Sequence, residues 1–353
     1  MKKLTVLLVL LSYSITAQVR NYSNEFLNIG VDAASFGMGK AVTATTNDVN
    51  AIYWNPAGLV KLQDAQAALM HTEYFQGIAK YDYAAYAKPL DNQSAIAISF
   101  IRFSVDDILN TTQLIDSQGG IDYNRISLFN ASDMALHLAY AKHQLLKNFD
   151  IGVNAKIVHR RIGEFANSWG FGLDVGFQYQ IKEYKLGLML RDITTTFNAW
   201  SIDSDSFTQI SDAVPEQNQE EPEALELTKP KAQFGISRMF SFGHDYKLIT
   251  TADLNMRFLE TNALIATSFV SIDPSIGFQL GYDDMIYLRA GINNFQNQMN
   301  FDNSKSLSVE PNFGVGFKYN GIQIDYALSN IGGASGTLYS NVFSVKVDFE
   351  MFR

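Results

Sequence analysis

The sequence contains no cysteine, which excludes a disulfide framework, a thiolate metal site and a lipid anchor on an N-terminal cysteine. Charged residues make up only 18% of the 353 residues and the net charge is −9, which disfavours a nucleic-acid partner. Beyond Ala17 the sequence has no apolar run of the roughly 20 residues that a membrane-spanning helix needs. Composition alone is still compatible with a secreted soluble domain.

The local patterns of a metal or catalytic site are also missing. The five histidines are scattered, and no pair has the spacing of metal ligands. "GMGKAV" (37–42) has the glycines of a phosphate-binding loop but not the lysine and hydroxyl pair that follows in such loops. No Gly-x-Ser-x-Gly element is present. We therefore expect no catalytic residue, no metal and no cofactor, and we predict that the protein is not an enzyme.

The first 17 residues have the three parts of a secretory signal peptide. Lys2 and Lys3 precede an apolar run from Leu4 to Leu11, and Ala17 is a small residue at the cleavage position. The apolar run is too short for a membrane anchor, which needs about 20 residues. We therefore expect export and cleavage after Ala17.

Apolar and polar residues alternate with a period of two along most of the remaining chain. In "GFGLDVGFQYQ" (170–180) one face is aromatic and aliphatic, whereas the other carries glycine, aspartate and glutamine. "NFGVGFKY" (312–319) and "SVKVDFEM" (344–351) repeat the pattern. Such segments are strands with one apolar face, as in a water-soluble sandwich or in a membrane barrel with that face toward lipid.

Three features favour the membrane barrel. Many segments have about ten residues, which suits a tilted strand crossing a bilayer better than the usual five or six. Their polar faces mix glycine with charged and amide residues, and tyrosines gather near their ends. Short turns alternate with longer connections at 106–132, 193–229, 294–308 and 329–341. We predict an all-β, antiparallel transmembrane barrel of about 14 strands over residues 64–353, in contact with outer-membrane lipid and with its long loops outside the cell.

One long connection contains an apolar element. In "RFSVDDILNTTQLID" (102–116) the apolar residues are Ile108, Leu109, Leu114 and Ile115. An exposed coil would not favour four large apolar side chains. We expect this segment to fold back as an external lid or as a short helix.

Residues 18–63 precede the alternation and do not share it. Small residues dominate 33–44, so the segment is too compact for a tail, and we expect a hatch inside the barrel lumen. The segment ends in "AIYWNPAGL" (51–59). Pro56 forces Asn55 into an extended conformation, the side chain of Asn55 can bind local backbone, and Ala57 and Gly58 permit a tight reversal. The motif predicts a rigid turn from hatch to wall, with Tyr53 and Trp54 packed nearby.

The hatch resembles that of the FadL-like outer-membrane barrels and, within them, the PorV/PorQ branch of Bacteroidota. The resemblance extends through "SFIRFSVDDILNTT" (99–112) and "SWGFGLDVGFQY" (168–179) to the last strand. The residues that carry it in the hatch are Gly37, Met38, Gly39, Asn47, Asp48, Asn50, Ala51, Trp54, Asn55, Pro56, Ala57, Gly58 and Leu59.

This resemblance implies a fourteen-stranded barrel with an inward hatch and two alternative functions. PorV-type members serve type IX secretion, where they receive the C-terminal signal domains of exported proteins, and this accessory role to a secretion translocon is our first expectation. FadL-type members carry hydrophobic small molecules such as long-chain fatty acids. An apolar pocket above the hatch and a gap in the wall would favour transport, whereas an occluded lumen and an apolar external loop would favour secretion. A lipid-modifying membrane enzyme, a third class, has no positive feature in the sequence.

Overall fold

The computed structural model describes residues 23–75, 77–115, 119–146, 148–205, 207–208, 224–299, 304–329 and 339–349. The expected signal peptide and residues 18–22 of the expected hatch lie outside these ranges. The elements are η1 (Glu25–Asn28), α2 (Ala33–Gly37), α3 (Ala51–Trp54), η2 (Pro56–Lys61), β1 (Gln66–Tyr74), β2 (Ala79–Asp91), β3 (Ser94–Asn110), η3 (Tyr123–Arg125), β4 (Ser127–Leu146), β5 (Phe149–Ile162), β6 (Ala166–Ile181), β7 (Tyr184–Arg191), β8 (Thr196–Ile202), β9 (Leu225–Thr228), β10 (Lys231–Phe242), β11 (Tyr246–Arg257), β12 (Ile265–Ala266), β13 (Ser271–Tyr282), β14 (Ile286–Met299), β15 (Lys305–Tyr319), β16 (Ile322–Ser329) and β17 (Ser340–Asp348).

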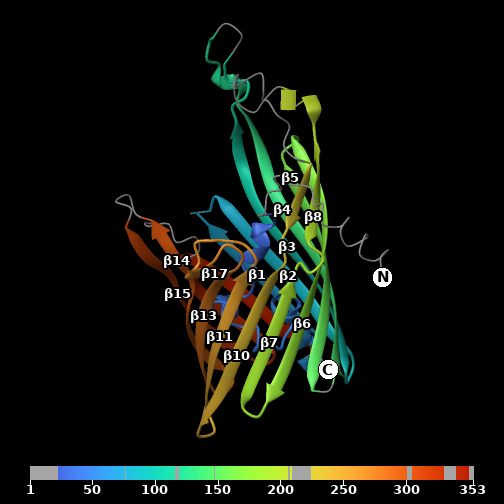
Figure 1. Ribbon diagram of the computed structural model, residues 1–353, viewed down its shortest axis with the longest axis vertical. Coiled ribbons are helices and arrows are strands. Elements are labelled where there is room, and N and C mark those ends of the chain that lie inside the picture. Colours follow the sequence, from blue (N-terminus) through green and yellow to red (C-terminus); the bar gives the residue numbers. More distant parts are fainter. Residues whose placement is uncertain are drawn as a thin grey trace, which may run out of the picture.

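The strands close into a barrel (Figure 1). Of the seventeen strands in the sheet, β8, β9 and β12 are short additions, and the other fourteen form the wall. Each wall strand pairs antiparallel with its neighbours, and β1 pairs with β17 to close the ring. Closure leaves no wall strand with an unpaired edge. The predicted fourteen-stranded antiparallel barrel is confirmed.

The two faces of the wall differ as the alternation predicts. In β6 the aromatic residues face outward, and the side chain of Trp169 is 58% exposed. Its neighbours on the other face point into the lumen, where Asp174 and Gln178 are 1% and 2% exposed. The described part of the chain contains no helix that is long and apolar enough to span a membrane.

The connections between strands differ in length at the two rims of the barrel. At one, the short-turn rim, two-residue turns join wall strands, as at 92–93 between β2 and β3. At the other, the long-loop rim, several strands run further than the sequence predicts. β3 continues to Asn110 and pairs there with β4, so most of the loop expected at 106–132 is a hairpin. The backbone groups of paired strands form hydrogen bonds whatever their side chains are. Strands can therefore extend beyond the segment in which apolar and polar residues alternate.

The hatch, here residues 23–63, lies inside the barrel, where its short helices are visible behind the wall strands (Figure 1, blue). Its apolar residues form one buried cluster with lumenal residues of the wall, most of which lie on β1 to β4. The hydrophobic core of the molecule is therefore the contact between hatch and wall.

Candidate functional site

The motif at the end of the hatch is a short helix and a 3-10 helix joined at Asn55. This residue is extended (φ −163°, ψ 102°) and caps η2, which begins at Pro56. Its Oδ1 accepts a hydrogen bond from the amide of Ala57 at 3.2 Å, which confirms the expected local bond. Its Nδ2 donates to the carbonyl oxygens of Thr43 at 2.9 Å and of Phe177 in β6 at 3.0 Å. Asn55 therefore holds the turn and also attaches the hatch to the wall.

The two aromatic residues before Asn55 bind the start of the hatch. The hydroxyl of Tyr53 donates to the carbonyl of Leu27 at 2.6 Å, and the indole nitrogen of Trp54 donates to the carbonyl of Val31 at 3.1 Å. Their rings meet edge to face, with centroids 4.9 Å apart. These contacts connect the two ends of the hatch, so it forms one packed unit.

Glycines on the lumenal face of the wall allow the hatch backbone to touch the strands. A Cβ atom on Gly277 would lie 2.4 Å from the carbonyl oxygen of Met38. A Cβ atom on Gly291 would lie 2.2 Å from the amide nitrogen of Gly39. No other residue type fits at such separations, because any side chain begins with a Cβ.

Together seven wall glycines form what we call the glycine belt, because the position of each Cβ would lie within 3.0 Å of a hatch atom. Six of them face one another in pairs across neighbouring strands. The belt comprises Gly152, Gly176, Gly187, Gly235, Gly277, Gly291 and Gly314. The sequence shows glycine on the polar faces, but which glycines meet the hatch depends on register and could not be read from it.

The remaining motif residues lie in or beside this contact. Asp48 forms an ion pair with Lys346 of β17 at 2.5 Å, and Asn47 lines a cavity on the same side. The backbone of Asn50 precedes α3, and Gly58 lies against the carbonyl of Thr46. Of the predicted hatch residues, Gly37, Met38, Gly39, Asp48, Asn55 and Pro56 thus contact the wall, whereas the contacts of Trp54 and Gly58 given above are with other parts of the hatch.

The other side of the hatch packs against small side chains. The lumenal residues of β1 to β4 include Tyr81, Tyr83 and Ile101, all of them buried. η2 contacts β2 to β6. The alanines on these four strands that belong to the buried cluster are Ala68, Ala79, Ala85, Ala87, Ala95, Ala97, Ala135, Ala139 and Ala141.

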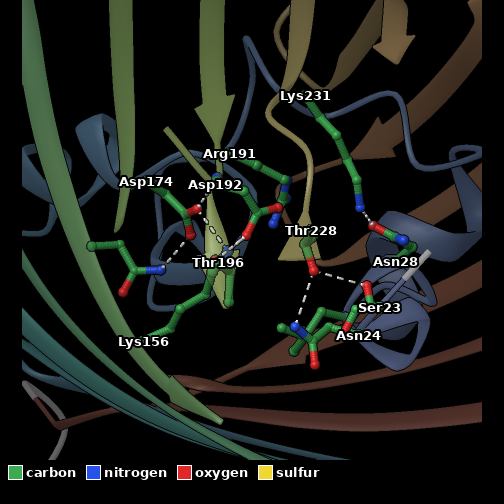
Figure 2. A network of polar contacts seen from close by, with 12 residues as sticks. Ser23, Asn24, Asn28, Lys156, Asp174, Arg191, Asp192, Thr196, Thr228 and Lys231 are labelled. Carbon is green, nitrogen blue, oxygen red and sulfur yellow. Dashed lines mark hydrogen bonds and ion pairs between the residues drawn. The ribbon is translucent and has the colours of Figure 1, made fainter. Parts of the chain in front are cut away.

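A buried ion cluster lies where one wall strand is interrupted (Figure 2). The strand breaks after Arg191 at the end of β7 and resumes at Thr196 as β8, which pairs with β6. Nζ of Lys156 lies 2.7 Å from a carboxylate oxygen of Asp174 and 2.6 Å from one of Asp192. All three side chains are at most 7% exposed. Buried charges of this kind are stable only when they are paired and hydrogen-bonded.

The same break is attached to the hatch. Arg191 donates to the carbonyl of Tyr53 at 2.8 Å, and its guanidinium lies 4.6 Å from the centre of the Tyr53 ring. Nearby, Thr228 donates to the carbonyl of Ser23 at 3.1 Å and Lys231 donates to Asn28 at 2.8 Å (Figure 2). Sequence reasoning missed this cluster, although Asp174 does fall on the polar face of its segment.

The hatch separates two cavities in the lumen. The long-loop chamber has a volume of about 410 Å³ and is lined by Leu27, Ile29 and Trp54 of the hatch and by both basic and acidic residues, the acids being Glu25, Asp273 and Glu310. The short-turn chamber has a volume of about 570 Å³ and is mostly polar. Among the lining residues of the long-loop chamber are Arg191, Lys231 and Arg257. The long-loop chamber is therefore amphiphilic rather than purely apolar.

One acid of the hatch has a perturbed pKa. Asp32 accepts hydrogen bonds from Ser344 of β17 and from Ser35, each at 3.1 Å. Burial, and then the nearby carboxylates of Asp325 and Asp48, raise the pKa of Asp32 to about 6. This group therefore titrates close to neutral pH.

The residues of the expected lid lie at the tip of the β3–β4 hairpin. Ile108 and Leu109 belong to β3, and Ile115 forms an isolated bridge with Ile121. The carbonyl of Leu114 accepts from the amide of Asp122 at 2.9 Å. The side chains of Leu109 and Ile115 are 62% and 64% exposed. A protruding strand pair thus takes the place of the short helix that the sequence suggested (Figure 1).

Within the described ranges no group of three or more His, Asp or Glu residues could hold a metal ion. His71 and His143 each bond to one aspartate, at 2.7 Å and 2.6 Å. His71 also lies 3.9 Å from Glu73, so each histidine contacts one or two carboxylates rather than a set of metal ligands.

The fold is that of the FadL-like outer-membrane barrels. The chain resembles the toluene transporter TodX of P. putida with a TM-score of 0.58 and 14% sequence identity, over 91% of this chain and 99% of that one. It resembles the CymD monoaromatic hydrocarbon channel with a TM-score of 0.56 and 12% identity, over 91% and 98%. A Pseudomonas aeruginosa FadL homologue gives a TM-score of 0.50 and 12% identity, over 90% and 98%.

No protein-family model and no curated protein matches the sequence. At 12–14% identity the likeness to the solved structures concerns the fold. It covers 90–91% of this chain, and it carries no specific resemblance to the PorV/PorQ branch.

Proposed function

We propose that the protein is a non-enzymatic outer-membrane transporter of hydrophobic small molecules, with the hatch as its gate. Two of the solved structures that share its fold are a hydrocarbon channel and a toluene transporter. In this proposal the apolar outer face contacts outer-membrane lipid, and the long-loop rim faces outward. The alternative that the sequence left open is thus better supported than the secretion role expected first.

The long-loop chamber is the observation that carries the proposal. Its floor is the hatch, which presents Leu27, Ile29 and Trp54. Its wall presents the cations of Arg191 and Lys231, neither of which lies within 4.0 Å of a carboxylate in the described part of the chain. Such a cavity fits a molecule with an apolar body and a polar or anionic end.

Trp54 provides a direct test of binding in this chamber. In a Trp169→Phe, Trp200→Phe background in nanodiscs, Trp54 is the remaining tryptophan. We expect saturable quenching of its fluorescence by a brominated fatty acid or by bromobenzene. Ala263→Phe, which narrows the chamber, should weaken the quenching. Unsaturable quenching by both probes would contradict the proposal.

The hairpin tip favours a second candidate, the type IX secretion accessory of the PorV/PorQ type. Leu109, Ile115 and Ile121 are each at least 60% exposed at the long-loop rim, as a surface for signal domains of exported proteins would be. A pull-down from native membranes tests this role. Recovery of a secretion translocon or its cargo by the parent protein, and its loss in Leu109→Ser/Ile115→Ser, would support it. Recovery of lipid alone would favour transport.

A further inference from the structure

The short-turn chamber, on the opposite side of the hatch, is lined by charged residues of both signs. Besides five aspartates, six basic side chains line it. Four of them are paired with carboxylates: Lys247 with Asp284, Arg289 with Asp325, Lys318 with Asp348 and Lys346 with Asp48. Lys61 and Lys185 have no carboxylate within 4.0 Å among the residues that the structure describes.

The two unpaired lysines lie in the same corner of the chamber. Lys61 ends η2, and its Nζ donates to Oε1 of Gln178 in β6 at 2.5 Å. Gln178 lies opposite Gly187 in β7, two residues from Lys185 on the same lumenal face. Lys61 and Lys185 therefore approach the same part of the chamber from the hatch and from the wall.

The electrostatic environment agrees with this arrangement. Burial, followed by repulsion from Lys185, lowers the pKa of Lys61 to about 8. Asp150 opposes this shift, but its carboxylate lies more than 4.0 Å from Nζ of Lys61 and forms no ion pair with it. A partly buried pair of like charges without a counterion is unfavourable, and an anion between them would remove the repulsion.

We propose that Lys61 and Lys185 bind an oxyanion, the carboxylate or phosphate group of a small molecule in the short-turn chamber. Each ammonium has three donors, and the bond to Gln178 uses one donor of Lys61, so donors remain for the oxygens of a ligand. Gln178 also donates to the carbonyl of Thr46 in the hatch at 2.9 Å. An anion that draws Lys61 away from Gln178 would therefore act on a residue that holds the hatch. The site does not depend on the proposed transport.

Lysine acylation read by mass spectrometry tests the proposal on the full chain in nanodiscs. Inorganic phosphate and octanoate are the probes, and chloride at equal ionic strength is the control. At ten times its Kd a probe fills about nine tenths of a site, so acylation of Lys61 and Lys185 should slow about tenfold. The paired Lys247 and Lys318 should be unaffected.

Protection by phosphate alone identifies a phosphate site, and protection by octanoate alone identifies a carboxylate site for an amphiphile. Absence of protection by both probes, or equal protection by chloride, would overturn the proposal.

The variant Lys61→Gln/Lys185→Gln should bind the protecting probe at least about tenfold more weakly, whereas the control Lys247→Gln should bind it as the parent does. Unchanged affinity in the double variant would place the anion elsewhere. Trp54 quenching reports the other chamber, so failure of this site leaves the transport proposal open.

Discussion

The hatch meets the barrel through two unlike halves. Against β5 to β15 the contact is backbone to backbone at the glycine belt, supplemented by directed bonds such as Asn55 to Phe177. Against β1 to β4 the contact is made mainly by alanines and aromatic rings, with two directed bonds at β1, from the amide of Val49 to Gln66 and from the amide of Asp32 to Met70. In this second half the hydroxyls of Tyr81 and Tyr83 are buried and have no partner in the described part of the chain.

The two halves differ in what they do for the hatch: one fixes its position, and the other stabilises it by packing. Hydrogen bonds and backbone contacts at a fixed separation define one place for the hatch, because they depend on direction and distance. Dispersion contacts with alanine are weakly directional, so they stabilise the hatch without fixing its register. We therefore expect substitutions on the side of β5 to β15, the polar half, to displace the hatch from its position. Substitutions on the side of β1 to β4, the apolar half, should weaken its packing without displacing it.

The largest expected effect is on the buried ion cluster beside the polar half. Lys156→Met would leave Asp174 and Asp192 without their cation, and removal of one partner from a buried pair costs about 3–5 kcal/mol. Chemical unfolding of the purified barrel measures this loss. The control Lys247→Met breaks the exposed pair with Asp284 and should cost less than about 1 kcal/mol. Equal losses in the two variants would contradict a special role for the cluster.

The glycine belt should give the next largest effect, and one strand supplies its own control. Gly277→Ala would place a Cβ 2.4 Å from the carbonyl oxygen of Met38, whereas Gly281→Ala on the same face of β13 meets nothing closer than 3.4 Å. Overpacking costs about 1–3 kcal/mol, and two opposed backbones have little room to relax. Hydrogen exchange over residues 36–46 should accelerate in Gly277→Ala alone. Similar exchange in both variants would show that the belt does not hold the hatch.

The barrel was predictable from the sequence because its evidence is local. Alternation within a segment such as 170–180 defines a strand and its two faces without knowledge of its partners. The extended backbone of Asn55 was also predictable from the sequence, because the proline after it restricts its conformation directly.

The contacts between hatch and wall were not readable, because they join residues far apart in the sequence. The same holds for the ion cluster: Lys156 lies in β5 and Asp192 lies in the break after β7, and their meeting depends on register and on that break. The same limit applies to the β3–β4 hairpin, where the apolar residues suggested a lid or a short helix and pairing between the two strands extends to Asn110.

The effect of pH on Asp32 should be smaller and should have a definite sign. Its folded pKa of about 6 lies above the ordinary 3.8, so the stabilisation is fully present below pH 3.8 and is lost as the pH rises through 6. The shift corresponds to about 3 kcal/mol at most, since one pKa unit is about 1.4 kcal/mol. Hydrogen exchange of the hatch, corrected for intrinsic rates, should show tighter contact at pH 5 than at pH 7.5. Asp32→Asn should remove this dependence, and a dependence that persists in the variant would assign it to another group.

The smallest effects should come from two buried tyrosine hydroxyls, one bonded inside the hatch and one without a partner in the described part of the chain. Tyr53→Phe removes a hydroxyl that donates to Leu27, and the loss of such a bond costs about 0.5–1.5 kcal/mol. Tyr81→Phe removes a buried hydroxyl that has no partner in the described ranges, so it should be neutral or slightly stabilising. Both substitutions delete one oxygen from a buried ring, which makes each the control for the other. Thermal unfolding measures the pair. A loss in Tyr81→Phe as large as that in Tyr53→Phe would mean that the hydroxyl of Tyr81 also makes a stabilising bond.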